Sequence, residues 1–208
     1  MTQTAPAVIL ASTSPARSRI LTNALVPFTV SPSAVDEEGE LSQLIAKSGK
    51  PSSAEEAVFL AGLKAEAVAR DAAGAIVIGC DSVFEVDGVS YGKPYTVEEA
   101  VNRWSIMSGK TGTLHTGQVV IDTTNGNLRS SRVVSTEVTF TEVSPEEARA
   151  YAETGEPLQC AGAFTLDGRG SAFVAGIQGD ANAVIGISTA ALREQFAELG
   201  HMLPLAAL

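Results

Sequence analysis

The chain has 208 residues, of which 45% are hydrophobic and 18% are charged, and these values are typical of a folded globular protein rather than a disordered one. Its formal net charge of -10 argues against a general binder of nucleic acids or anionic membranes, because such binders rely on basic surface. The length fits a single domain over residues 1–208, with room for two lobes, and is sufficient to bury a core.

The sequence carries no sign of export or of membrane insertion. No basic segment followed by an apolar core opens the chain, and no run approaches the ~18 apolar residues of a membrane-spanning helix. Cys80 and Cys160 are too few for a disulfide framework, so we expect a cytoplasmic protein with reduced thiols. His115 and His201 are the only histidines, which nearly excludes a His-rich zinc site.

The first predicted elements are a strand at residues 7–10 and a helix that starts at Ser14 and Pro15. Free amides at the helix start, neighbouring hydroxyl groups and Arg17 would together form a site for an anion. The alternative is an ordinary capped turn with solvated arginines, and the local sequence leaves both interpretations open.

An acidic segment at residues 35–38 follows a predicted second strand at residues 28–30. Acidic loops are usually solvated surface, and the functional alternative is that Glu37 helps Asp81 to hold a divalent cation. Residues 42–52 have the composition of a polar connection to the next helix.

The segment Ser53–Glu56 has a capping-box pattern and predicts a helix that reaches about Gly74. Apolar residues at helical spacing define its buried face, namely Val58, Ala61, Ala65 and Val68. Lys64 lies off this face, where lysines are usually solvated, and periodicity alone assigns it no role.

The stretch around Asp81 is where we expect the chemistry. Residues 75–78 form an apolar run without alternation, which predicts a strand buried on both faces that ends at Asp81. Ligands of open α/β sheets bind at the carboxyl ends of strands, so this position suits a catalytic carboxylate.

A predicted hairpin follows Asp81. Residues 83–86 and 89–91 flank Asp87-Gly88, a pair that suits a two-residue turn with positive φ angles. Such a hairpin would return Lys93 toward Asp81, and a base beside a cation suits attack on a phosphate. The alternative is an aspartate that caps a turn and a solvated lysine.

The helix predicted from Thr96 carries Trp104 on its apolar face, which favours a core position over a stacking platform. Ser108–Thr111 is not a phosphate-binding P-loop, because Trp104 occupies the position that requires glycine. The remaining predicted elements are strands at 119–121 and 135–140 joined at Asn125-Gly126, a helix from Ser144 to about Gly155, a glycine-rich loop at 160–170, a strand at 172–174, a loop at 179–186 and a helix from about Ser188.

Taken in order, these residues resemble the Maf family of nucleoside triphosphate pyrophosphatases. The resemblance runs from about residue 7 to residue 188, nearly the whole chain, and rests on an ordered set of short motifs. The motifs are Leu10–Pro15 with Arg17, Asp36-Glu37, Lys64-Ala65, Gly79–Ser82, Gly92–Pro94, Ser108-Gly109, Thr116-Gly117, Ala161-Gly162 and Gly179-Asp180.

The resemblance implies an α/β fold with a mixed, bent sheet and helices around a deep cleft between two lobes, as in the inosine triphosphatase fold. Members of the family hydrolyse a nucleoside triphosphate between the α and β phosphates and release the monophosphate and pyrophosphate. They need a divalent cation, usually magnesium or manganese. Many of them are dimers, so a homodimer is also expected.

The resemblance further implies roles for individual residues. Asp81 would accept the proton of the attacking water and would hold the metal together with Glu37. The residues that would bind the phosphates of the substrate are Ser14, Arg17, Lys64 and Lys93. Magnesium prefers carboxylate and phosphate oxygens to imidazole, in keeping with a chain that has only two histidines.

Departures from the family pattern bear on the nucleobase. The branch that acts on dTTP and UTP usually has two arginines after its Ser-Pro pair, and the first of these positions is Ala16 here. The stretch at residues 160–164 resembles instead the branch that acts on 7-methyl-GTP. Asp167, an acceptor when ionised, would suit the donor groups of guanine, unless it points to solvent. We expect a purine or modified-guanine nucleotide in preference to dTTP and UTP.

Two other classes of function stay open. One is a regulatory nucleotide-binding protein of the same fold that acts in septum formation, and an intact Asp81 with Lys93 argues against it. The other is a kinase or nucleotide-binding module, which only the Ser108–Thr111 stretch suggests and its spacing disfavours.

Overall fold

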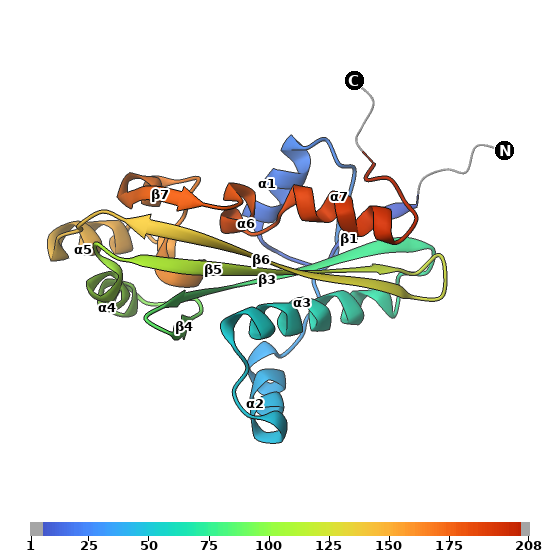
Figure 1. Cartoon of the computed structure of the whole chain (residues 1–208), viewed down its shortest axis with the longest axis horizontal. Coiled ribbons are helices and arrows are strands. Elements are labelled where there is room, and N and C mark those ends of the chain that lie inside the picture. The colour runs from blue at the N-terminus through green and yellow to red at the C-terminus, as the bar shows by residue number, and fades with distance from the viewer. Residues whose placement is uncertain (1–5, 205–208) are drawn as a thin grey trace. The chain divides into compact units, whose positions relative to one another are not determined.

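A mixed sheet of seven strands runs through residues 6–204, the part of the chain that the computed structural model describes (Figure 1). Its order is β2-β1-β3-β5-β6-β7, and β4 pairs with β3 off this path. The strands are β1 (Ala7–Leu10), β2 (Thr29–Val30), β3 (Ala75–Val86), β4 (Val89–Tyr91), β5 (Thr111–Asp122), β6 (Leu128–Phe140) and β7 (Val174–Gln178).

The α-helices are α1 (Pro15–Asn23), α2 (Glu37–Ser48), α3 (Ser53–Ala69), α4 (Val97–Met107), α5 (Pro145–Glu153), α6 (Ala181–Ile185) and α7 (Thr189–Glu198). Three short 3-10 helices are η1 (Glu156–Gln159), η2 (Ala161–Ala163) and η3 (Arg169–Phe173). The mixed α/β class predicted from the sequence is confirmed.

The described residues divide into two compact units. The first contains residues 6–81, 116–134 and 186–204, and the second contains residues 82–115 and 135–185. Strands β3, β5 and β6 contribute residues to both units. The predicted single domain and the predicted cleft between two lobes stay predictions.

Parallel pairing around β1 organises the first unit. Leu10 of β1 lies opposite Val30 of β2 on one side and opposite Ile78 of β3 on the other. Figure 1 shows α3 on one side of these strands and α1 and α7 on the other. Small and branched side chains fill the space under α3, namely Ala11, Ala61, Ala65, Val68, Val77, Val119 and Ile121.

Two glycines let the backbone of α3 approach the sheet closely. A Cβ atom added to Gly79 of β3 would lie 2.2 Å from the Ala61 carbonyl oxygen. A Cβ atom added to Gly117 of β5 would lie 2.2 Å from the Ala57 carbonyl oxygen. Both distances are far below van der Waals contact, so only glycine lets the helix lie at this depth.

β3 is longer than the apolar run that predicted it. The strand continues to Val86, so the prediction that it ends at Asp81 is wrong. Only the burial changes there, from complete to partial at Asp81 and Ser82. A strand is defined by its backbone pairing, and a polar side chain does not interrupt that pairing.

The predicted hairpin after Asp81 is confirmed. β4 pairs antiparallel with β3, and the turn at Asp87-Gly88 has φ angles of 52° and 74°. These are the positive values that an Asp-Gly pair tolerates and that a two-residue turn requires.

Aromatic side chains form the core of the second unit. Trp104 is 1% exposed, and its indole N–H donates to the Ala163 carbonyl at 3.0 Å, which confirms its predicted core position. Its ring meets that of Phe140 edge to face, with centroids 5.3 Å apart. Other large residues of this cluster are Phe84, Met107, Leu114, Tyr151 and Phe164.

The predicted polar connection at residues 42–52 is wrong, because α2 fills most of it. Asp36 caps this helix, and its Oδ1 accepts a hydrogen bond from the Gly39 N–H at 3.1 Å. The acidic segment expected in a loop therefore supplies a cap and a first turn, where negative charge stabilises a helix. α2 buries none of its residues, so its apolar side chains Leu41, Leu44 and Ile45 stay partly or fully exposed.

The start of α3 lies one residue earlier than predicted. Ser52 is the cap, Glu55 completes the capping box, and the helix ends at Ala69 before the predicted Gly74. Nearer the C-terminal end, β7 replaces the predicted strand at 172–174, and α6 occupies much of the predicted loop at 179–186.

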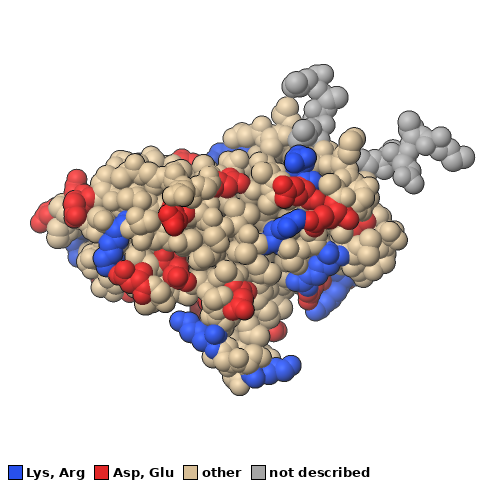
Figure 2. All heavy atoms as spheres, viewed as in Figure 1, with Lys and Arg blue, Asp and Glu red and all other residues tan. Residues whose placement is uncertain are grey.

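No helix among residues 6–204 combines the length and the apolar character that crossing a membrane requires. On the face shown in Figure 2, lysines and arginines lie among aspartates and glutamates and form no continuous basic area.

We predict that Gly79→Ala lowers the free energy of unfolding by about 1–3 kcal/mol, because the new methyl group meets the backbone of α3 and the helix must shift. Gly176→Ala is the matched control, since Gly176 lies in a strand, lacks a positive φ and has no atom within 4 Å of an added Cβ atom. Its effect should stay within about 0.5 kcal/mol. Urea unfolding measures both variants, and equal losses would contradict the close approach of α3.

Candidate active site

An ammonium group and two carboxylates meet at α2, α3 and β3 of the first unit. The Lys64 Nζ lies 2.5 Å from the Asp81 Oδ1 and 2.9 Å from the Glu37 Oε2. The Lys64 side chain is 10% exposed, that of Asp81 14% and that of Glu37 42%. The structure thus brings together three of the predicted site residues, and the interpretation of Lys64 as a solvated lysine is wrong.

The local structure explains why these three side chains meet. An added Cβ atom on Gly79 would lie 2.7 Å from the Ala65 nitrogen, so the neighbouring Lys64 is held against β3 near Asp81. Glu37 is the first residue of α2, directly after the Asp36 cap that starts the helix.

The loop between β1 and α1 begins beside the same part of β3. Leu10 lies opposite Ile78, and the Ala11 N–H donates to the Ile78 carbonyl at 2.8 Å. Ser14 then caps α1 as predicted, and its Oγ accepts from the Arg17 N–H at 3.4 Å. The helix start that was expected to receive an anion therefore follows directly from the strand next to Asp81.

Arg17 points into the protein rather than into solvent. It is 9% exposed, its Nε donates to the Gly186 carbonyl at 2.9 Å, and its Nη1 donates to the Ser12 Oγ at 3.1 Å. A buried guanidinium is costly unless its N–H groups find acceptors, and these two contacts supply acceptors. The alternative of a solvated arginine is thereby excluded for Arg17.

The Cys80 thiol responds to the charges gathered at this site. Burial raises its pKa to about 11, while the positive charges of Arg17 and Lys64 oppose that rise and the charge of Asp81 adds to it. The thiol therefore stays protonated at neutral pH, which makes Cys80 unsuitable as a nucleophile.

A buried pair of amides anchors the segment that carries Gly186. The Gln118 Nε2 donates to the Ser188 carbonyl at 3.2 Å, and its Oε1 accepts from the Ser188 N–H. The Gln195 Nε2 in turn donates to the Gln118 carbonyl at 3.1 Å. Residues 186–188 are thus tied to β5 and α7 and, through Gly186, to Arg17.

Sequence reasoning missed Glu56, a further carboxylate close to Asp81. Burial raises the pKa of Glu56, the negative charge of Asp81 adds to the rise, and Lys50 opposes it. Glu56 precedes Lys64 on α3 by about two helical turns, and this spacing was the only signal available in the sequence.

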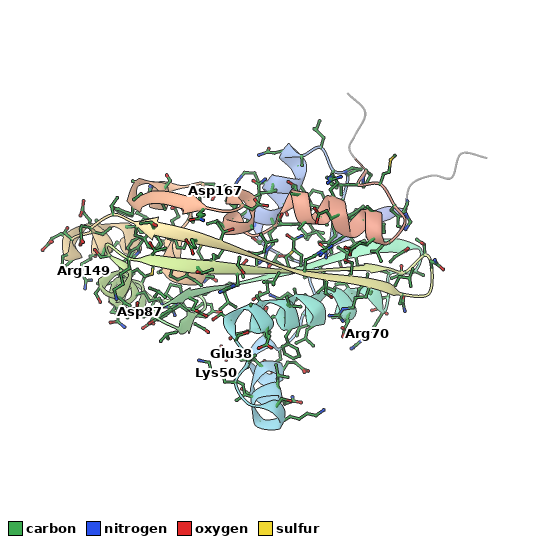
Figure 3. All side chains as sticks on the ribbon, viewed as in Figure 1. Glu38, Lys50, Arg70, Asp87, Arg149 and Asp167 are labelled. Carbon is green, nitrogen blue, oxygen red and sulfur yellow. The ribbon has the colours of Figure 1, made fainter. Side chains whose placement is uncertain are left out.

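Lys93 and Asp167 belong to the second unit, so the proximity of Lys93 to Asp81 stays a prediction. Both residues are exposed, and the charge of each affects the pKa of the Cys160 thiol. Burial raises the pKa of the Cys160 thiol, the charges of Glu156 and Asp167 raise it further, and Lys93 lowers it. Figure 3 labels Asp167, which stands between η2 and η3.

Glu156 organises the loop that carries Asp167. Its carboxylate accepts four hydrogen bonds, from the Tyr151 hydroxyl at 3.0 Å, the Thr165 hydroxyl at 2.5 Å, and the N–H groups of Arg169 and Gly170 at 3.1 Å each. Burial alone would raise the pKa of Glu156, but these hydrogen bonds outweigh it and lower the pKa. An ionised carboxylate thus holds the loop on both sides of Asp167.

Comparison with known proteins agrees with this architecture. The family model described as Maf-like protein matches residues 7–199. A nucleoside triphosphate pyrophosphatase of Streptomyces coelicolor is 47% identical over 93% of this chain and 90% of its own length. Proteins with the same name from Synechococcus sp. (strain JA-2-3B'a(2-13)) and Corynebacterium diphtheriae are 46% and 42% identical, over 95% and 93% of this chain and 96% and 94% of their own lengths.

We predict that Lys64→Met lowers the free energy of unfolding by about 1.5–3 kcal/mol at neutral pH, because it leaves two carboxylates close together without the ammonium that both contact. Lys47→Met is the matched control, since Lys47 is exposed on α2, and its effect should stay within about 0.5 kcal/mol. Chemical unfolding measures both. A loss in Lys64→Met no larger than that of the control would show that these ion pairs do not stabilise the fold.

Proposed function

Because this chain belongs to the Maf-like protein family, we propose that it is a nucleoside triphosphate pyrophosphatase. The proposed reaction uses water to cleave the substrate between its α and β phosphates and yields the nucleoside monophosphate and pyrophosphate. The names of the relatives support this proposal. The observation that carries it is the contact of Lys64 with both Asp81 and Glu37, since phosphate hydrolysis needs a base and positive charge at one place.

Asp81 is the proposed general base. Its side chain is 14% exposed, and its Oδ1 contacts the Lys64 ammonium at 2.5 Å. A carboxylate is a weak base at neutral pH unless the water that it deprotonates is polarised by a cation. The proposal for Asp81 is therefore coupled to a proposal for a metal.

We propose that Glu37 and Asp81 hold a divalent cation, magnesium or manganese. Oxygen atoms of Glu37 and Asp81 lie 2.9 Å and 2.5 Å from the single Lys64 Nζ, and this closeness supports the proposal that they share one cation. Among residues 6–204 no three His, Cys, Asp or Glu side chains cluster as a metal site of their own. This donor set suits magnesium, which commonly takes one or two carboxylates and completes its shell with phosphate oxygens and water. Such an ion would neutralise charge on the phosphate oxygens and acidify water.

The proposed phosphate-binding residues are Ser14, Arg17, Lys64 and Lys93. The cap at Ser14 leaves amide N–H groups at the start of α1, and Arg17 lies in the first turn of the same helix. In an acidic protein a triphosphate is tolerated only where such positive groups are gathered. Lys93 is the proposed contribution of the second unit.

A regulatory protein without activity is not favoured. The compared relatives carry the name of an enzyme, and Asp81 and Lys64 lie in contact, as the proposed reaction needs a carboxylate and positive charge at one place. We propose further that the protein acts in the cytoplasm, which free thiols at Cys80 and Cys160 suit, and that it forms a homodimer, an expectation that rests on the family alone.

For the nucleobase we propose a purine, with a modified guanine such as that of 7-methyl-GTP preferred over dTTP and UTP. Asp167 supports this proposal because an ionised carboxylate accepts the hydrogen bonds that guanine donates from its amino group and ring N–H. The hydrogen bonds of Glu156 on both sides of Asp167 would keep that acceptor in place. Ala16 lacks the planar donor that arginine would offer to the carbonyl groups of a pyrimidine.

We predict that the protein with magnesium or manganese releases pyrophosphate from nucleoside triphosphates, and that Asp81→Asn lowers turnover by about 10²-fold or more. The control Asp71→Asn, at an exposed aspartate of the same unit, should keep the activity. Pyrophosphate release from a panel of nucleotides measures these effects. Unchanged turnover in folded Asp81→Asn would refute the proposal that Asp81 is the general base. Absence of pyrophosphate release with every nucleotide would refute the proposed pyrophosphatase activity.

We also predict that kcat/KM for guanine nucleotides, 7-methyl-GTP included, exceeds that for UTP and dTTP, and that Asp167→Asn reduces this preference by about tenfold because the amide replaces an acceptor by a partial donor. Steady-state kinetics with GTP, 7-methyl-GTP, UTP and dTTP measure the preference, with Asp71→Asn again as the control. If UTP and dTTP exceed every guanine nucleotide by about tenfold, the proposed base preference is refuted.

A further inference from the structure

Arg103 is a buried cation on α4, and its guanidinium contacts two backbone carbonyl groups and one carboxylate. It is 8% exposed, and its Nη1 donates to the Gly92 carbonyl while its Nη2 donates to the Lys93 carbonyl at 3.3 Å. Its Nε donates to the Glu99 Oε1 at 3.0 Å, one helical turn away. The planar guanidinium therefore spans two consecutive carbonyl groups and a carboxylate.

The segment that Arg103 holds has no strand partner of its own. β4 ends at Tyr91, and α4 begins at Val97. Besides Arg103, the Gly162 N–H donates to the Gly92 carbonyl at 3.3 Å, and the Tyr91 ring lies under the guanidinium at 5.5 Å. The path of this segment is thus defined by the contacts of Arg103 and by two isolated backbone bonds to other segments, the second from the Tyr95 N–H to the Leu158 carbonyl at 3.0 Å, rather than by the ladder of a strand.

Lys93 is exposed to solvent, whereas its backbone carbonyl is held by Arg103. Its side chain takes part in none of the ion pairs among residues 6–204. A lysine side chain is long and flexible, so the direction in which it can reach depends on where its backbone is held.

We propose that Arg103 is the positioning residue for Lys93: by holding the carbonyls of Gly92 and Lys93, it directs the Lys93 ammonium to a phosphate of the substrate. This inference rests on the proposed function, and it adds a residue that touches no substrate atom itself. It also explains why α4 buries an arginine at a position flanking the apolar face that carries Trp104.

The test is a double-mutant cycle with Arg103→Lys and Lys93→Ala. Arg103→Lys keeps the positive charge and most of the aliphatic side chain. It replaces the planar guanidinium by a single ammonium group, which cannot hold the carbonyls of both Gly92 and Lys93. The control is Arg149→Lys, at an exposed arginine of α5 that faces a carboxylate one turn away and is labelled in Figure 3. Three readouts are measured: binding of inorganic tripolyphosphate by calorimetry, kcat/KM for the preferred nucleotide, and amide hydrogen exchange over residues 90–96.

We expect Arg103→Lys to weaken tripolyphosphate binding and to lower kcat/KM by about tenfold each in the parent protein, and by less than about twofold in the Lys93→Ala background. Amide exchange should become faster over residues 90–96, and Arg149→Lys should change none of the readouts. Equal losses in both backgrounds, unchanged exchange, or a parent protein that does not bind tripolyphosphate would overturn the proposal. A parent that binds tripolyphosphate but hydrolyses no nucleotide would refute the proposed function alone, and the binding cycle would then still decide the role of Arg103.

Discussion

The candidate site depends on the depth at which α3 lies against β3. Lys64 is off the apolar face of its helix, and at an ordinary helix-to-sheet distance such a lysine would reach into solvent. Gly79 removes the side chain that would keep the two backbones apart, so Lys64 comes into contact with Asp81 instead. The contact between Lys64 and Asp81 therefore depends on the close packing of the α3 and β3 backbones.

Outside the strands and helices, the functional segments are held by bonds from side chains to distant backbone. The Gly186 carbonyl accepts a hydrogen bond from Arg17, and the Ser188 carbonyl accepts one from Gln118. Residues 165–170 are held by hydrogen bonds to the Glu156 carboxylate. In each case a polar group that would be costly to bury alone is satisfied by the segment that it positions. Stability and the orientation of the loops consequently come from the same contacts.

Much of the fold follows from signals that lie within a few residues of each other. Ser14 with Pro15, Asp87-Gly88 and the spacing around Trp104 each predicted the observed element, because a cap, a turn and an apolar face act locally. α2 was not predicted because its apolar residues, Leu41, Leu44 and Ile45, are few and lie in a segment of otherwise polar composition that is typical of a connection.

The site was predictable in part, for a related reason. Motif resemblance marked Lys64, Asp81 and Glu37 as functional, but periodicity favoured a solvated lysine and an acidic loop. Their meeting depends on a contact between elements that are far apart in the sequence, and no local pattern encodes it. Glu56 lies in the first turn of α3, and only the folded structure reveals that burial and the charge of Asp81 raise its pKa.

The anchoring of Arg17 by Gly186 has a consequence for the order in which the protein is assembled during translation. The acceptor lies 169 residues after the arginine, and the amide of Gln118 likewise awaits Ser188 and Gln195. While the ribosome is still making the later part of the chain, Arg17 and Gln118 lack these partners, because the first unit itself includes residues 186–204. Until residues 186–198 have been made and packed against β5, Arg17 cannot adopt the geometry that it has in the folded protein, so the first unit should be completed only when synthesis is nearly finished.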